Sequence, residues 1–154
     1  MMLQRRVPLR RTPLRSGGLL RKVAAKVTRP PSAGPAGVSA LVLAQVLHRT
    51  VLFEDPTCEV CGWVLIGERG LAWSVHHRRF RDGRPDSHLP QNLLVVHGAS
   101  NVDRCHGRIH GDKREAIANG WAISRHGAAD PLDVPVLTAR GWVLFDDEGG
   151  WRPW

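Results

Sequence analysis

The spacing of cysteine and histidine constrains this chain of 154 residues more than any other feature of its sequence. Two of its three cysteines stand in the motif Cys58-Glu59-Val60-Cys61, and the third opens the motif Cys105-His106-Gly107-Arg108-Ile109-His110. A CxxC pair is typical of a metal or redox site, and imidazoles four residues apart on a helix share one face. Because 16 Gly and 11 Pro place much of the chain in loops, a bound metal would stabilise the small core.

Positive charge is concentrated in the first part of the chain. The formal net charge is +8, and the first 53 residues hold ten of the 22 basic residues but no acidic ones. Residues 1–36 lack apolar periodicity, so we expect a flexible basic arm whose partner is DNA rather than an anionic membrane. An inert solubilising tail is the alternative. The longest apolar run, residues 38–47, is too short to span a bilayer, and three cysteines cannot all pair, so we expect a soluble, cytoplasmic protein.

The hydrophobic pattern predicts a small α+β fold. A helix is expected over 37–53, with Ser39 as its N-cap and its apolar positions buried on most sides. A second helix is expected over 104–119, capped by Asp103 and stopped by Gly120. Strands are expected at 62–66, 71–75, 92–97, 120–124 and 141–145, the first two joined by a turn at 67–70.

A histidine pair precedes the helical pair. His76 and His77 follow directly on an expected strand, where adjacent side chains point to opposite faces. One of them can therefore bind an ion together with His106 and His110, while the other faces a substrate. The helical pair alone would equally well be solvated or capping histidines. The two pairs together indicate a metal site with a further histidine beside it.

Three segments in this order resemble the HNH endonucleases, particularly the small type of actinobacterial bacteriophages: His76-His77, Asn92-Leu93-Leu94 and Cys105–His110. The resemblance implies a ββα-metal fold, in which a β-hairpin carries the first histidines and the Asn and packs on a helix with the last two. The expected organisation is a flexible arm at 1–36, an HNH nuclease domain with a zinc knuckle at 37–119 and a short β-rich extension at 120–154.

The resemblance also implies a role for each matching residue. His76 would be the first metal ligand, where many relatives have Asp, and His106 and His110 would complete the protein's share of the ligands. His77 would take a proton from the attacking water, and Asn92 would hold the hairpin loop and orient His77 by a hydrogen bond. The ion would be Mg²⁺, Mn²⁺, Ni²⁺ or Zn²⁺, and DNA would be cut to 5′-phosphate and 3′-hydroxyl ends. Related phage enzymes often work beside the terminase that packages DNA, so packaging proteins in the host cytoplasm are candidate partners.

The cysteines predict a second, structural metal site. Thiolates favour tetrahedral zinc, which needs four ligands, and His97 is the candidate fourth beside Cys58, Cys61 and Cys105. In similar phage sequences a cysteine commonly stands at the position of His97. Cys105 and His106 diverge by about 100° on a helix, so they would face different metals. A thioredoxin-like redox pair is the alternative for CxxC, but no βαβ pattern surrounds it.

Six basic residues are candidate phosphate contacts, with solvated charge as the alternative for each. They are Arg78, Arg79, Arg81, Arg84, Arg108 and Lys113. The other histidines without a partner at a useful spacing are expected on the surface: His48, His88 and His126. Two other classes of protein compete with a nuclease, a catalytically silent zinc-ribbon DNA-binding module and a structural phage protein of the packaging machinery. A binding module has no use for the full histidine set.

Overall fold

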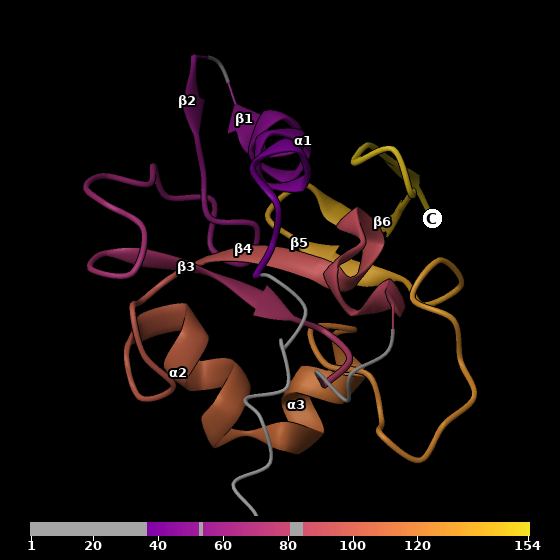
Figure 1. The fold of residues 1–154 in the computed structure, drawn as a ribbon. Coiled ribbons are helices and arrows are strands. Elements are labelled where there is room, and N and C mark those ends of the chain that lie inside the picture. Colours follow the sequence, from indigo (N-terminus) through magenta and orange to yellow (C-terminus); the bar gives the residue numbers. More distant parts are fainter. Residues whose placement is uncertain (1–36, 53, 81–84) are drawn as a thin grey trace, which may run out of the picture. The chain divides into compact units, whose positions relative to one another are not determined.

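The computed structural model describes residues 37–52, 54–80 and 85–154. The basic arm predicted for residues 1–36 lies outside the described residues. The described chain mixes helices with small antiparallel sheets, as the α+β prediction requires (Figure 1). None of its helices has both the length and the apolar character needed to cross a membrane. The elements are α1 (Ala40–Thr50), β1 (Val51–Leu52), β2 (Asp55–Pro56), β3 (Trp73–His77), η1 (Pro85–His88), η2 (Pro90–Asn92), β4 (Leu93–His97), α2 (Arg104–Gly111), α3 (Lys113–Ala118), β5 (Val136–Thr138), β6 (Gly141–Phe145) and β7 (Trp151–Pro153).

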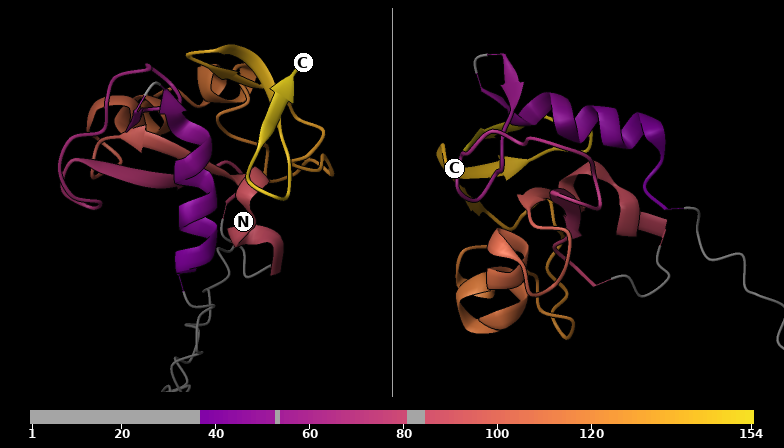
Figure 2. Two further views of the ribbon diagram at one scale, coloured as in Figure 1. Left: turned by 90° about the horizontal axis from the view of Figure 1, so that it is seen from above. Right: turned by 90° about the vertical axis from the view of Figure 1, so that its left-hand side faces the viewer.

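The antiparallel pair β3–β4 lies at the centre of these elements. It pairs Trp73 with His97 at one end and His77 with Leu93 at the other. α1 packs on one side of the pair and α2 on the other, as Figure 1 and the right-hand view of Figure 2 show. β4 is therefore buried on both faces from Leu93 to Val96. An unbroken apolar run is what a strand covered on both faces requires.

The predicted hairpin between residues 62–66 and 71–75 is wrong. Residues 62–66 contribute only an isolated bridge, and the neighbour of β3 is β4. The reason lies in the CxxC turn, where the Gly62 amide donates to the Cys58 carbonyl and the Cys58 amide donates to the Trp63 carbonyl, both at 2.8 Å. The chain folds back on the cysteines, and Trp63 stays 75% exposed.

α1 begins as predicted, because the Ser39 hydroxyl accepts a hydrogen bond from an amide of the first turn at 3.2 Å. The expectation that its apolar residues are buried on most sides is wrong. Within α1 only Val46, Arg49 and Thr50 are buried, and Leu41 is 71% exposed. The helix covers one side of β4, so its opposite face remains in contact with solvent.

The second predicted helix is broken into α2 and α3. Gly111 and Asp112 lie at the break, and the Asp112 carboxylate caps α3 by accepting a hydrogen bond from the Glu115 amide at 2.9 Å. Glycine is a weak helix former and aspartate competes for backbone amides, so a new N-cap replaces continuous helix here. Gly120 follows α3 at a φ of +67°, where a Cβ would lie 1.8 Å from the Pro135 carbonyl oxygen. No other residue fits this close approach.

The C-terminal residues form the sheet β5–β6–β7. β6 matches the strand predicted at 141–145, whereas no strand forms at 120–124. There the buried Trp121 donates its indole N–H to the Leu137 carbonyl at 2.6 Å, and the Ile123 amide donates to the Arg78 carbonyl at 2.7 Å, so single contacts to separate segments replace strand pairing. Trp121 and Phe145 belong to the same hydrophobic core as β4.

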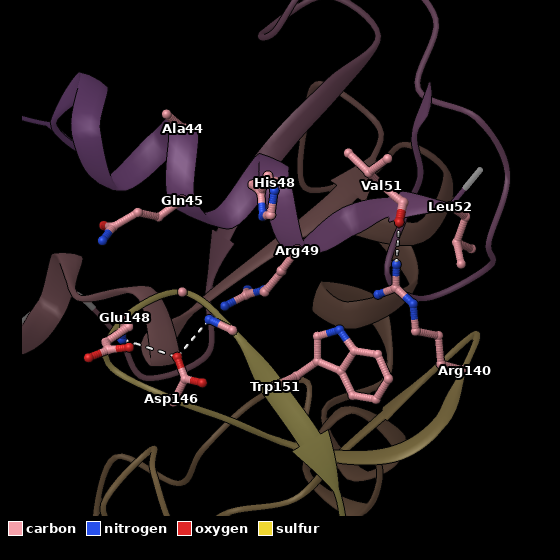
Figure 3. Close-up of a pocket in the computed structure, with 12 residues that line it drawn as sticks. Ala44, Gln45, His48, Arg49, Val51, Leu52, Arg140, Asp146, Glu148 and Trp151 are labelled. Carbon is pink, nitrogen blue, oxygen red and sulfur yellow. Dashed lines mark hydrogen bonds between the residues drawn. The ribbon is translucent and has the colours of Figure 1, made fainter. Parts of the chain in front are cut away.

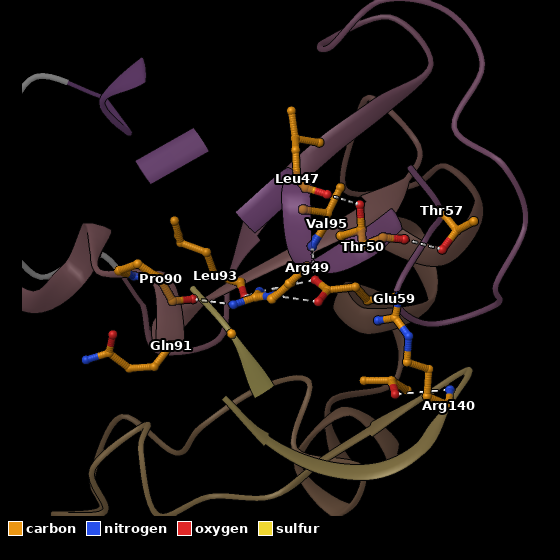
Figure 4. Close-up of polar contacts among 12 residues, drawn as sticks. Leu47, Arg49, Thr50, Thr57, Glu59, Pro90, Gln91, Leu93, Val95 and Arg140 are labelled. Atoms are coloured by element: carbon orange, nitrogen blue, oxygen red, sulfur yellow. Dashed lines mark hydrogen bonds and ion pairs between the residues drawn. The ribbon is translucent and has the colours of Figure 1, made fainter. Parts of the chain in front are cut away.

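A buried ion pair connects α1 to the CxxC segment and β4 (Figure 4). Arg49 Nε donates to Glu59 Oε1 at 2.7 Å, and both side chains are only 1% exposed. The other guanidinium nitrogens of Arg49 donate to Glu59 Oε2 and to the carbonyls of Pro90 and Leu93. Glu59 Oε2 also accepts from the Val95 amide at 2.7 Å. The two charges are thus paired and hydrogen-bonded inside the core, as buried charges must be.

A cavity of about 910 Å³ lies between α1 and the β6–β7 segment (Figure 3). Gln45 and His48 line it from α1, and Asp146 and Trp151 line it from the other side. The turn between β6 and β7 approaches α1 closely at Gly149, where a Cβ would lie 2.6 Å from Gln45 Cβ. The described residues around this cavity include none of the predicted metal ligands.

Candidate metal centres

The four predicted zinc ligands lie together near the end of β4. Cys58 and Cys61 come from the CxxC turn, His97 is the last residue of β4, and Cys105 lies in the first turn of α2. One ligand atom of each lies within 4.8 Å of all the others. We call these four residues the cysteine cluster. Three sulfurs and one imidazole at this spacing are a donor set compatible with zinc.

Hydrogen bonds already orient His97 for metal binding. Its Nε2 lies 3.1 Å from the Val64 carbonyl oxygen, which can only accept, so Nε2 carries the proton. Nδ1 then presents its lone pair to the cluster, 3.2 Å from Cys61 Sγ. Metal-bound histidines commonly donate their second ring N–H to a carbonyl in this way. Residues 62–66, which were predicted as a strand, therefore contribute the carbonyl that fixes the orientation of the His97 ring.

The thiols of the cysteine cluster do not ionise alike. A hydrogen bond from Cys105 lowers the pKa of Cys58 to about 5, against burial, which raises it. The same hydrogen bond, together with burial, holds the pKa of Cys105 well above its usual range. This contact therefore favours the thiolate form of Cys58 and the protonated form of Cys105. Coordination to a dication deprotonates a thiol outright, so both can serve as thiolate ligands.

Three histidines from β3 and α2 form a second group, which we call the histidine cluster. His76 belongs to β3, and His106 and His110 lie one turn apart on α2. One ligand atom of each lies within 4.8 Å of the others. The ring centroid of His76 is 5.3 Å from that of His106 and 5.1 Å from that of His110, and the two helical rings are 4.9 Å apart. The structure thus brings together the three residues predicted to hold the catalytic ion.

The histidine cluster fits a metal ion. His76 is only 7% exposed, and its Nε2 has no hydrogen-bond partner among the described residues. A buried nitrogen without a partner costs free energy, which a bound ion would relieve. Burial, followed by the charges of neighbouring histidines, lowers the pKa of His76 to about 3, and burial also lowers the pKa of His106. Both imidazoles are therefore neutral near pH 7, the form that binds metal.

His77 lies next to the histidine cluster and contacts His88. His77 Nε2 is 3.1 Å from His88 Nδ1, and the ring centroids are 5.1 Å apart. The expectation that His88 is a surface histidine without a partner is therefore wrong. Sequence reasoning missed this residue because the two histidines are 11 positions apart and the period of no helix or strand relates them.

Asn92 holds the loop that follows His77. Its side-chain oxygen accepts from the Arg79 amide at 2.7 Å, and its nitrogen donates to the carbonyls of Ser87 and Arg79 at 3.0 and 3.3 Å. Both amide protons are thereby used on the backbone. These contacts fix the backbone two residues after His77, so Asn92 supports the position of His77 through the chain that follows it.

The prediction that Arg78 contacts phosphate is wrong. Its side chain lies in the core, with 1% exposure, because its guanidinium satisfies backbone carbonyls there. Burial, followed by the charge of Arg49, lowers the pKa of Arg78 to about 9, so it stays charged at neutral pH. The four carbonyls that accept from it at 2.6–3.1 Å belong to Gly120, Gln91, Pro131 and Val134. Arg78 thus joins distant segments of the chain instead of binding a ligand.

The other basic candidates differ in their surroundings. Arg108 is exposed and forms an ion pair with Glu115, whose hydrogen bond raises the pKa of the arginine. Lys113 is exposed at the start of α3, and Arg79 is partly buried. Arg81 and Arg84 lie outside the described residues. Arg108 and Lys113 are therefore the candidates that the described structure presents to solvent.

Comparison with family models, with curated proteins and with solved structures gave no match. The residues of the two clusters and their geometry are therefore the features that indicate a function for this chain.

Proposed function

We propose that this chain is a metal-dependent HNH endonuclease that hydrolyses DNA phosphodiester bonds to 5′-phosphate and 3′-hydroxyl ends. The observation that carries the proposal is the histidine cluster, with His77 beside it on β3. β3, β4 and α2 follow one another in the order of a ββα unit, a hairpin packed on a helix. A phosphodiester is an anion, so neutral imidazoles that hold a dication offer positive charge where this substrate needs it.

His76, His106 and His110 would hold the divalent ion. When bound, such an ion neutralises a phosphate oxygen and stabilises the leaving 3′-oxygen. Imidazole ligands suit Ni²⁺ and Zn²⁺, whereas Mg²⁺ prefers oxygen. His76 stands where many relatives of the HNH type have Asp, so the donor set of this chain favours a transition-metal ion.

His77 is the proposed general base, which accepts a proton from the attacking water. Imidazole titrates near neutral pH and is the commonest group for this task. His88 contacts the His77 ring, and Asn92 fixes the loop that follows it, so both restrict its orientation. The cysteine cluster would hold a structural zinc and fix the start of α2, which carries His106.

A catalytically silent zinc-ribbon module is the competing proposal. It would use the cysteine cluster alone and would leave the buried Nε2 of His76 without a function. Three converging imidazoles therefore favour the nuclease. Work beside a phage terminase is proposed from the resemblance alone.

Plasmid cleavage by the purified protein tests the proposal. We expect nicking with Mn²⁺, Ni²⁺ or Zn²⁺, loss of cleavage with retained metal in His77→Ala, and loss of the ion in His110→Ala. His126→Ala is the matched control, because His126 is exposed and belongs to neither cluster. Cleavage that survives His77→Ala would reject this base. Wild-type protein that binds the ion but leaves DNA intact would reject the nuclease.

A further inference from the structure

Ser74 contacts the histidine cluster from the same strand as His76. Alternate residues of a strand point the same way, so β3 directs Ser74 and His76 to one face. Ser74 Oγ lies 2.8 Å from His106 Nδ1 and 2.6 Å from the Gly98 carbonyl oxygen. The hydroxyl thus connects the residue after β4 to a histidine of α2.

These two contacts determine which nitrogen of His106 carries a proton. A carbonyl oxygen can only accept and a hydroxyl has one proton, so the Ser74 hydroxyl donates to Gly98. The Ser74 oxygen then accepts from His106 Nδ1, which must be the N–H. Nε2 of the neutral ring is left with its lone pair for an ion. The opposite tautomer would set two lone pairs against each other at this contact.

The carbonyl that accepts from Ser74 is itself held in place. The Gly98 amide donates to the Ala72 carbonyl at 2.9 Å, and Gly98 has a φ of +102°. A Cβ at Gly98 would lie 2.2 Å from the Asp103 carbonyl oxygen and 3.3 Å from His106 Cβ. Only glycine fits so close to the start of α2, so the acceptor has little freedom to move.

We propose that Ser74 is a positioning residue that fixes His106 in its Nδ1–H tautomer and so prepares Nε2 to bind the divalent ion. This inference rests on the metal site of the proposed function. Metal-bound histidines commonly donate their second N–H to a partner that sets the ring orientation, and loss of that partner typically lowers metal affinity about 10–100-fold.

Two measurements on the full-length, zinc-loaded protein test this role without DNA. Long-range ¹H–¹⁵N NMR, with the histidine cluster free of metal, reports the tautomer of His106, and calorimetry measures the affinity for Ni²⁺. We expect the Nδ1–H tautomer in the wild type and in Ser74→Thr, which keeps the hydroxyl. Ser74→Ala should show mixed tautomers and bind Ni²⁺ about 10–100-fold more weakly. The exposed Ser100→Ala is the matched control and should behave like the wild type.

An Nε2–H tautomer of His106 in the wild type would overturn the inference, and this measurement needs no variant to fold. Equal Ni²⁺ affinities of the wild type and folded Ser74→Ala would also overturn it, as would a wild type that binds no Ni²⁺ at the histidine cluster. If the protein shows the expected tautomer and affinities but leaves plasmid DNA uncut, the proposed nuclease activity is wrong and the role of Ser74 stands.

Discussion

Replacing Glu59 by glutamine should destabilise the protein by about 3–5 kcal/mol, the cost of breaking a buried ion pair. The change keeps the shape of the side chain but leaves the Arg49 guanidinium in the core with two carbonyls and the Phe145 ring, whose centroid is 3.7 Å from the guanidinium carbon. Both carboxylate oxygens of Glu59 accept hydrogen bonds, from Arg49 and from the Val95 amide. The NH₂ group of a glutamine would therefore face an N–H donor of Arg49 or Val95, and no hydrogen bond could form there. Domains are stable by only about 5–15 kcal/mol, so this loss is large.

Urea unfolding with saturating zinc measures the loss as a shift of the midpoint at constant slope. Glu68→Gln is the control, because this glutamate is exposed and its replacement should change stability by less than about 0.5 kcal/mol. The double variant Arg49→Leu, Glu59→Leu should recover part of the loss, since it leaves no unpaired charge in the core. A Glu59→Gln loss below about 1 kcal/mol, the range of exposed pairs, would refute the reasoning.

Three further perturbations test other parts of the structure. Cys58→Ser should lose the zinc and unfold at a lower temperature. His97→Cys, which substitutes a thiolate, should keep the zinc and the melting temperature of the wild type, as metal analysis and melting curves will show. With the histidine cluster free of metal, stability should fall as pH drops from 6.5 toward about 3, because the unfolded chain binds a proton at His76 that the folded chain does not. Unfolding of His76→Gln over this pH range should show a shallower loss, and parallel curves would contradict the burial argument. Deleting residues 1–36 should flatten the log–log salt dependence of DNA affinity by about 0.9 for each phosphate that the arm neutralises, and equal slopes would show that the arm does not touch DNA.

Four of the seven ligands can be predicted from sequence because they form two pairs that obey a local rule, whereas the prediction of His97 as the fourth zinc ligand has support from the family resemblance. Two residues separate the cysteines of the CxxC turn, and one helical turn separates His106 from His110. The break between α2 and α3 falls after His110, so the wrong helix boundary leaves this spacing intact. The same locality explains why Ser39 and Gly120, the residues at the start of one helix and after another, are correctly predicted.

Features that depend on contacts between distant segments could not be predicted. Nothing near Arg78 in the sequence distinguishes a buried arginine from one that binds phosphate, because its carbonyl partners lie 13 to 56 residues away. Residues 62–66 carry the apolar pattern of a strand, yet β4 supplies the partner of β3 across a loop. The contact of His77 with His88 and the pair of Arg49 with Glu59 likewise arise only in the folded chain.

Cys105 and His106 are consecutive residues of α2 that belong to different clusters. Their side chains leave the helix about 100° apart, so a single rotational setting of α2 must satisfy both groups of ligands. Insertion of one residue between them would turn His106 away from His76 and dismantle one cluster, whatever ions are present. An ion in either cluster would restrict the same rotation of the helix. Zinc among the cysteines would therefore raise the affinity of the histidines for their ion. By thermodynamic reciprocity, that ion would raise the affinity of the cysteine cluster for zinc by the same factor.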